Sequence, residues 1–178
     1  MTQDLVQHAE RYATSAHRRI DQRRKYTDQP YDAHLRAVVE IVETVTGDPE
    51  LLAAAWLHDT LEDTPATYDD IEREFGTEVA DLVAELTDVS RASDGNRAVR
   101  KSIDRAHLAR ASSRAKTVKL ADLIDNCRDI MRHDERFART YVTEAAGLLE
   151  VLHDGDPTLF ARAGKLVRRS AEQLGLPA

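Results

Sequence analysis

The sequence lacks the features that would mark a secreted, disulfide-bonded or membrane-spanning protein. A single cysteine, Cys127, in a chain of 178 residues excludes an internal disulfide framework. No apolar run approaches the length that crosses a bilayer, and the amino-terminal segment MTQDLVQHAERY has no apolar core of a secretion signal. We therefore expect a cytoplasmic protein without a membrane partner.

Several chemical motifs are missing as well. The chain contains no glycine-rich phosphate loop, no serine nucleophile elbow, no paired-cysteine metal knuckle, no internal repeat and no low-complexity segment. Its formal net charge of -7 argues against nucleic-acid binding, because phosphate backbones select proteins with a basic face. Local basic clusters at 18–25 and 97–119 still leave a small anionic substrate open.

Alternating β-branched runs are also absent, and helical periodicity takes their place. Val79, Leu82, Val83 and Leu86 follow the i, i+3, i+4, i+7 spacing of one helix face. We expect helices near 3–20, 32–46, 49–61, 67–75, 77–90, 96–110, 113–132, 136–153 and 157–173. The predicted fold is all-α, a compact multi-helix bundle. We expect 1–178 to be a single domain, with a core of about 5–150 and the carboxy-terminal helices packed on it.

The stretch AWLHDTLEDTP places four ionisable side chains at the end of an apolar helical run. His58 and Asp59 continue ridges that look buried, and Glu62 and Asp63 follow each of them at i, i+4. A buried carboxylate requires a partner, and a metal ion suits both imidazole and carboxylate ligands. The alternative is a helix end that has reached solvent. Local pattern leaves these two interpretations equal.

Two distant residues are further candidates, and for both the pattern favours an ordinary role. His34 shares a helical ridge with Val38 and Ile41, where a hydrogen-bonded core histidine is more common than a ligand. Asp122 and Asn126 project from the side opposite the apolar stripe of their helix, which favours a solvated face. Cys127 lies on that stripe and is expected to be a buried small hydrophobe. The remaining histidines are expected to be surface or structural residues, namely His8, His17, His107, His133 and His153.

The order His34, His58-Asp59, Asp122 resembles the metal-binding signature of HD-domain phosphohydrolases. The stretches AHRRIDQRRKYTDQPYDAH, LLAAAWLHDTLEDT and TVKLADLIDN are similar to the (p)ppGpp hydrolase domain of Rel/SpoT stringent-response enzymes and to the small alarmone hydrolases. The resemblance covers about residues 5–150. It overrides the local interpretation of Asp122 and favours a ligand role for His34.

This resemblance implies an enzyme that removes pyrophosphate from the ribose 3′ position of a guanosine alarmone, leaving GDP or GTP. One Mn²⁺ ion would be held by four ligands, which are His34, His58, Asp59 and Asp122. Glu62 and Asp63 would orient and deprotonate the attacking water, a role that suits carboxylates beside a metal-bound water. The implied substrate contacts are Arg24, Lys25 and Asn126, with Arg100 or Lys101 as additional cations for the pyrophosphate.

The chain departs from the alarmone hydrolases after KLAD, where it carries Leu123, Ile124 and Asp125. We expect this to alter a surface beside the substrate, so the alternative substrates are an adenosine alarmone, (p)ppApp, or another nucleotide phosphoester. The chain also ends where a bifunctional enzyme would continue into its synthetase domain, so we expect hydrolysis without synthesis. A degenerate domain that only binds a nucleotide is disfavoured by the complete ligand set. The oligomeric state stays open, with a homodimer as one option.

Overall fold

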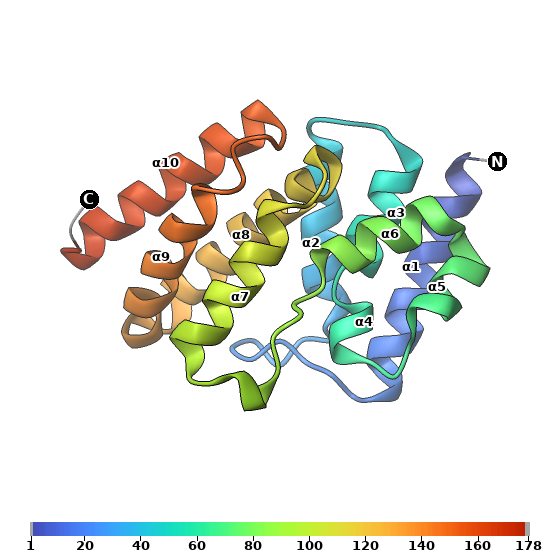
Figure 1. The fold of residues 1–178 in the computed structure, drawn as a ribbon, viewed down its shortest axis with the longest axis horizontal. Helices are drawn as coiled ribbons and strands as arrows, with labels where there is room; N and C mark the ends of the chain where they lie inside the picture. The colour runs from blue at the N-terminus through green and yellow to red at the C-terminus, as the bar shows by residue number, and fades with distance from the viewer. Residues whose placement is uncertain (1, 177–178) are drawn as a thin grey trace. The chain divides into compact units, whose positions relative to one another are not determined.

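Helices form all the regular elements of the computed structural model, which describes residues 2–176 (Figure 1). Outside the helices, one isolated β-bridge pairs Arg23 with Pro30 within this described range. The predicted all-α class is confirmed. No helix in the described part of the chain combines the length and the apolar character needed to cross a membrane.

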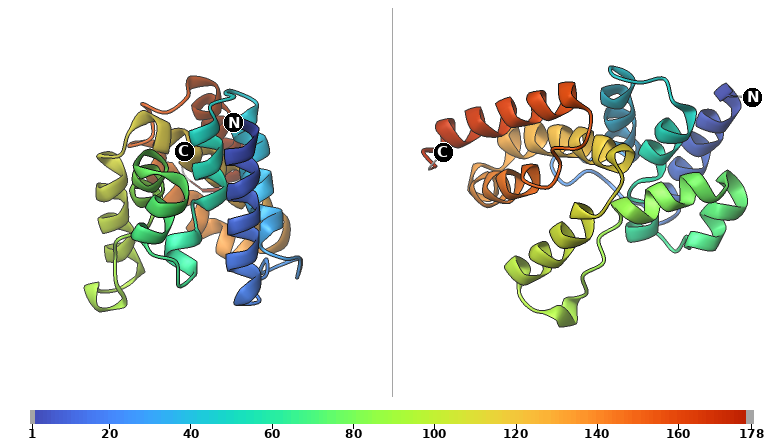
Figure 2. Two further views of the ribbon diagram at one scale, coloured as in Figure 1. Left: turned by 90° about the vertical axis from the view of Figure 1, so that its right-hand side faces the viewer. Right: turned by 45° about the horizontal axis from the view of Figure 1, so that its top comes forward.

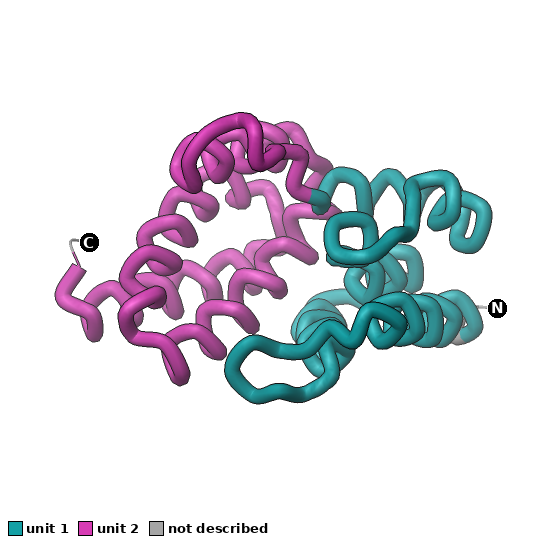
Figure 3. The backbone as a smooth tube through the Cα atoms, turned by 90° about the horizontal axis from the view of Figure 1, so that it is seen from below, with its two compact units in different colours: residues 1–87 teal, residues 88–178 magenta. Residues whose placement is uncertain are grey.

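The chain divides into two compact units, an amino-terminal unit of residues 1–87 and a carboxy-terminal unit of residues 88–178 (Figure 3). The organisation of the whole chain as one domain stays a prediction. The helices of the amino-terminal unit are α1 (Thr2–Arg19), α2 (Asp32–Glu43), α3 (Pro49–Leu57), α4 (Thr60–Asp63), α5 (Tyr68–Phe75) and α6 (Thr77–Leu86).

Helix α3 is the centre of the amino-terminal unit and contacts α1, α2 and α6. The Asp48 side chain accepts the backbone N–H groups of Glu50 and Leu51, and Pro49 occupies the first turn, so the sequence itself starts this helix. Every residue from 51 to 57 is buried, because its apolar residues cover all sides of the helix. Each buried leucine stabilises the unit by about 1.5–3 kcal/mol. This rigid helix leads directly to His58.

The carboxy-terminal unit contains η1 (Ala92–Asp94), α7 (Arg97–Ala109), α8 (Ser113–His133), α9 (Glu135–Leu149) and α10 (Pro157–Leu174). Helices α8, α9 and α10 pack against one another (Figure 2). The turn before α10 requires a glycine, since a Cβ on Gly155 would lie 2.8 Å from Leu120 Cδ1 and 3.2 Å from the Lys116 carbonyl carbon. Cys127 is buried on α8, as predicted.

The predicted helices match the observed ones to within a few residues, with one instructive exception. The helix predicted over 49–61 ends at Leu57, and a separate four-residue helix, α4, begins at Thr60. The prediction of one continuous helix was wrong at this point. The residues of greatest chemical interest occupy the break.

Candidate metal centre and active site

His58 and Asp59 form the turn between α3 and α4. His58 keeps helical angles, but Asp59 has φ -99° and ψ 0°, a sparsely populated region in which active-site residues are often found. The backbone N–H of Asp63 still donates to the Asp59 carbonyl at 3.0 Å. The break therefore redirects the Asp59 side chain while keeping Glu62 and Asp63 on the next turn.

His34, His58 and Asp59 converge in the amino-terminal unit. One ligand atom from each residue lies within 4.8 Å of the other two, and both histidines are 2% exposed. The Nε2 atoms of His34 and His58 lie 3.6 Å and 3.1 Å from Asp59 Oδ2. Ligands held about 2.1 Å from one tetrahedral ion are about 3.4 Å apart, so the three groups fit a single metal ion.

The hydrogen bonding of His58 supports this assignment. Its Nδ1 lies 2.8 Å from the Ala55 carbonyl oxygen, which can only accept, so Nδ1 carries the proton. In the neutral ring, Nε2 then presents a lone pair toward the Asp59 carboxylate. Two acceptors at this distance repel each other unless a cation, either a metal ion or a second ring proton, lies between them. Two imidazoles and a carboxylate are a donor set that divalent transition metals favour.

Tyr31 fixes the orientation of Asp59. Its hydroxyl donates to Asp59 Oδ2 at 2.6 Å, the short distance of a hydrogen bond to an ionised acceptor. Tyr31 is the residue directly before α2, and its ring lies 5.4 Å from that of His34 and 5.0 Å from that of His17. Tyr31 thus contacts two candidate ligands, Asp59 through a hydrogen bond and His34 through its ring.

The acidic pair on α4 divides into two different environments. Glu62 and Asp63 are both exposed in part, but Asp63 Oδ2 accepts a hydrogen bond of 2.8 Å from the Gln22 amide. Desolvation by the surrounding protein raises the pKa of Asp63, the Gln22 hydrogen bond opposes the rise, and the Asp59 carboxylate adds to it. A carboxyl group with a raised pKa is a suitable proton acceptor in a hydrolytic site.

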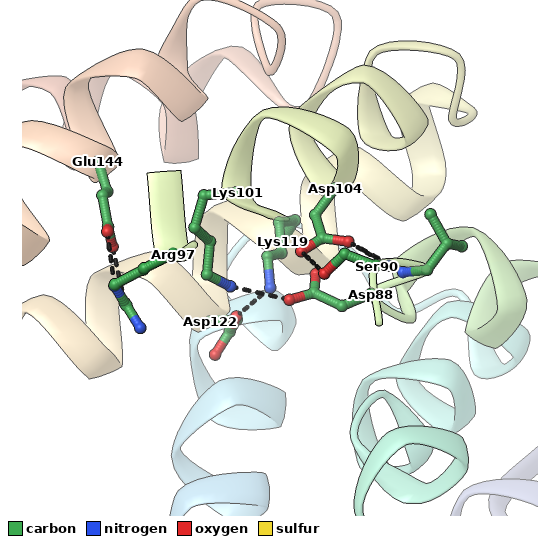
Figure 4. Close-up of polar contacts among 9 residues, drawn as sticks. Asp88, Ser90, Arg97, Lys101, Asp104, Lys119, Asp122 and Glu144 are labelled. Carbon is green, nitrogen blue, oxygen red and sulfur yellow. Dashed lines mark hydrogen bonds and ion pairs between the residues drawn. The ribbon is translucent and has the colours of Figure 1, made fainter. Parts of the chain in front are cut away.

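Asp122 lies on α8 in the carboxy-terminal unit and is 5% exposed. The solvated face favoured by periodicity was therefore wrong, because helices on more than one side cover α8. Both carboxylate oxygens accept hydrogen bonds. Lys119 Nζ donates to Oδ2 at 2.8 Å (Figure 4). The Asn126 amide donates to Oδ1 at 2.6 Å. Desolvation by burial raises the pKa of Tyr141 well above its usual range, and the Asp122 carboxylate adds to the rise. The role of Asp122 as a fourth ligand stays a prediction.

The predicted substrate contacts Arg24 and Lys25 lie in the loop that joins α1 to α2. This loop closes on itself, since the Arg24 N–H donates to the Gln29 carbonyl at 2.8 Å. Arg24 is half-buried and Lys25 is exposed. Of the two additional cations, Lys101 is paired with Asp88 at 2.8 Å (Figure 4).

The departure after KLAD has a different meaning in the structure. Leu123 and Ile124 are buried core residues of α8, each 1% exposed, so they form no exposed surface. The expectation that all three residues alter a surface was wrong for these two. Asp125 is half-buried and is the one residue of the three that keeps an exposed part.

The site can now be compared with known proteins. A family model described as HD domain matches residues 9–151. The chain belongs to the HD-domain family. The Drosophila melanogaster protein named guanosine-3′,5′-bis(diphosphate) 3′-pyrophosphohydrolase MESH1 is 42% identical to this HD domain over 122 residues, covering 67% of the chain and 65% of the fly protein. The matched part therefore spans about two thirds of that relative.

Two further relatives place the HD domain in the same branch. The Escherichia coli bifunctional (p)ppGpp synthase/hydrolase SpoT is 37% identical over 113 residues, which are 61% of this chain and 16% of SpoT. A solved structure described as a metazoan orthologue of SpoT that hydrolyses ppGpp superimposes with a TM-score of 0.82 at 33% identity, covering 93% of this chain and 94% of that one. The family resemblance inferred from the motifs is confirmed.

Sequence reasoning missed three residues that contact the predicted site residues. Tyr31 precedes His34 by three positions, and Lys119 precedes Asp122 by three, so helical spacing was a usable signal for both. Gln22 lies inside the basic cluster at 18–25 and is 41 residues from Asp63. No local pattern connects those two.

Proposed function

We propose that the protein is a metal-dependent hydrolase that removes the 3′-pyrophosphate of the guanosine alarmones (p)ppGpp, giving GDP or GTP. The group of two buried histidines, His34 and His58, and the half-buried Asp59, with an acidic pair on the next turn, is the observation that carries the proposal. Relatives whose names state this activity, at about 40% identity, support the choice of substrate.

The metal would be held by His34 and His58 through Nε2 and by Asp59 through a carboxylate oxygen, with Asp122 as the proposed fourth ligand. A divalent ion bound there would lower the pKa of a coordinated water and neutralise charge on the phosphoryl oxygens. We propose Mn²⁺ as the ion. Tyr31 would hold Asp59, and Lys119 and Asn126 would hold Asp122, so that each carboxylate is oriented before the ion binds.

Proton transfer is assigned to the acidic pair. Asp63 has one oxygen held by Gln22, which leaves Oδ1 to accept a proton from the attacking water. Glu62, on the same turn, would orient that water. Both side chains have exposed surface, as groups that meet a diffusing substrate must.

Substrate binding requires cations, because a pyrophosphate brings several negative charges to a protein of net charge -7. Arg24 and Lys25 are adjacent in one loop and are proposed to contact the nucleotide phosphates. Asn126 is proposed as a further contact, since the amide that donates to Asp122 carries a second N–H and a carbonyl oxygen. A cytoplasmic location, where nucleotides are abundant, is part of the same proposal.

The test is release of pyrophosphate from ppGpp by the purified, Mn²⁺-loaded protein. Asp59→Ala should reduce the rate to background, because it removes a metal ligand. Asp69→Ala removes an exposed carboxylate of α5 in the same unit and should leave the rate unchanged. A protein that binds one Mn²⁺ per chain and yet releases no pyrophosphate from any 3′-pyrophosphorylated nucleotide would contradict the proposal.

The same assay identifies which nucleobase the enzyme prefers in its substrate. A panel of ppGpp, ppApp and nucleotide phosphomonoesters, compared by kcat/KM, separates the proposed substrate from the alternatives. We expect ppGpp to be preferred, because the buried Leu123 and Ile124 do not reshape an exposed surface. A higher kcat/KM for ppApp would move the assignment to the adenosine alarmones.

A further inference from the structure

The loop between α1 and α2 contains a second polar connection to the site. Gln22 Nε2 donates to Asp63 Oδ2 at 2.8 Å, and Gln22 Oε1 lies 2.6 Å from His17 Nδ1. We infer that Gln22, locked by His17, is a positioning residue that holds Asp63 in the orientation needed for proton transfer. This inference rests on the proposed function and adds two residues to it.

The direction of both hydrogen bonds follows from the chemistry of the end groups. An ionised Asp63 can only accept, so Gln22 must turn its NH₂ group toward Asp63 and its carbonyl oxygen toward His17. That oxygen also only accepts, so His17 Nδ1 carries the proton. The series of hydrogen bonds from His17 through Gln22 to Asp63 therefore has one arrangement, because a reversed Gln22 amide would turn its carbonyl oxygen toward the Asp63 carboxylate.

The three hydrogen-bonded residues differ in burial, so the series runs from a buried residue to an exposed one. His17 is 0% exposed, Gln22 is half-buried and Asp63 is exposed. The His17 ring is packed against that of Tyr31, 5.0 Å between centroids, so it cannot swing away from the site. A rigid anchor beneath an exposed carboxylate is the arrangement expected of a supporting residue.

Backbone hydrogen bonds connect this anchor to the metal ligand. The Gln22 N–H donates to the His17 carbonyl, and the Tyr31 N–H donates to the Gln22 carbonyl, both at 3.1 Å. Tyr31 in turn donates its hydroxyl to Asp59. One loop therefore contacts Asp59 through Tyr31 and Asp63 through Gln22, so this single segment orients both carboxylates.

A structural role alone makes a different prediction from a positioning role. Asp63 is exposed on a four-residue helix, so loss of the Gln22 bond should leave Tm nearly unchanged. A rotated or displaced proton acceptor should instead lower kcat, since a misplacement of about 1 Å can cost about 10²-fold in rate. The expected loss is about 10- to 100-fold in kcat, with KM and the bound metal unchanged.

The experiment compares Gln22→Leu with Gln29→Leu in the Mn²⁺-loaded enzyme, measuring kcat and KM for ppGpp, metal content and Tm. Gln29 belongs to the same loop and is exposed, so its variant should match the wild type. Two variants of His17 separate the effect of its hydrogen-bond donor from the effect of side-chain volume. His17→Asn places an amide nitrogen where Nδ1 was and should retain most of kcat, whereas His17→Gln reaches the position of Nε2 and should lose it.

The outcomes are distinct. A wild-type enzyme that is active, with Gln22→Leu equally active, overturns the positioning role alone. A fall in kcat that is accompanied by an equal loss of bound metal, or by a large fall in Tm, also overturns it in favour of a structural role. A wild-type protein that holds Mn²⁺ but releases no pyrophosphate overturns the proposed function, and the positioning role with it.

Discussion

Replacing Tyr31 with phenylalanine should weaken metal binding at the candidate centre without changing its ligands. The lost hydrogen bond is 2.6 Å long and ends on the ionised Asp59. Its removal has two opposing effects, because the hydroxyl draws charge from the carboxylate but also fixes its orientation. Loss of such a supporting partner lowers metal affinity by about 10- to 100-fold, so orientation is the larger effect. This agrees with about 1.5–3 kcal/mol for a hydrogen bond to a charged group.

The assay is a Mn²⁺ titration followed by electron paramagnetic resonance, in which the free ion is counted directly. Tyr68→Phe is the matched control, since the Tyr68 hydroxyl donates to Asp81 at 2.7 Å and also ends on a carboxylate. That pair lies outside the candidate ligand group, so Mn²⁺ affinity should not change. The reasoning is refuted if Tyr31→Phe binds Mn²⁺ as tightly as the wild type, or if Tyr68→Phe weakens it equally.

Two further predictions concern the carboxy-terminal unit. The Asp104 carboxylate accepts the N–H groups of Val89 and Ser90 and the Ser90 hydroxyl (Figure 4). Burial alone would raise the pKa of Asp104, but the hydrogen bonds from Ser90 hold this pKa below its usual range. Asp104→Ala should lower the free energy of urea unfolding by about 1–3 kcal/mol above pH 4, and the difference should shrink as the pH falls and the carboxylate becomes protonated. A difference that does not shrink as the pH is lowered below 4 would contradict this. Gly155→Ala should destabilise by about 1–3 kcal/mol because its Cβ meets α8 at 2.8 Å, whereas Gly164→Ala, with nothing within 4 Å, should be neutral or stabilising by up to about 1 kcal/mol.

Much of this protein follows from its sequence alone. Helical periodicity identified an all-helical chain, because a helix that buries one face must repeat its apolar residues every three or four positions. The apolar run before His58 raised the possibility of a metal ligand, although a solvent-exposed helix end explained it equally well. The motif order of His34, His58-Asp59 and Asp122 then identified the HD-domain family, which the match over residues 9–151 confirms.

Tertiary structure alone decided which polar residues are buried and what they contact. Asp122 occupies the polar side of its own helix, yet it is 5% exposed, since burial depends on neighbouring helices that local periodicity cannot see. The break at Asp59 and the bond from Gln22 to Asp63, 41 residues apart, have no local signature. Side chains far apart in the chain meet only after the helices have packed, so candidate ligands could be named from the sequence, but the hydrogen bond from Gln22 to Asp63 could not.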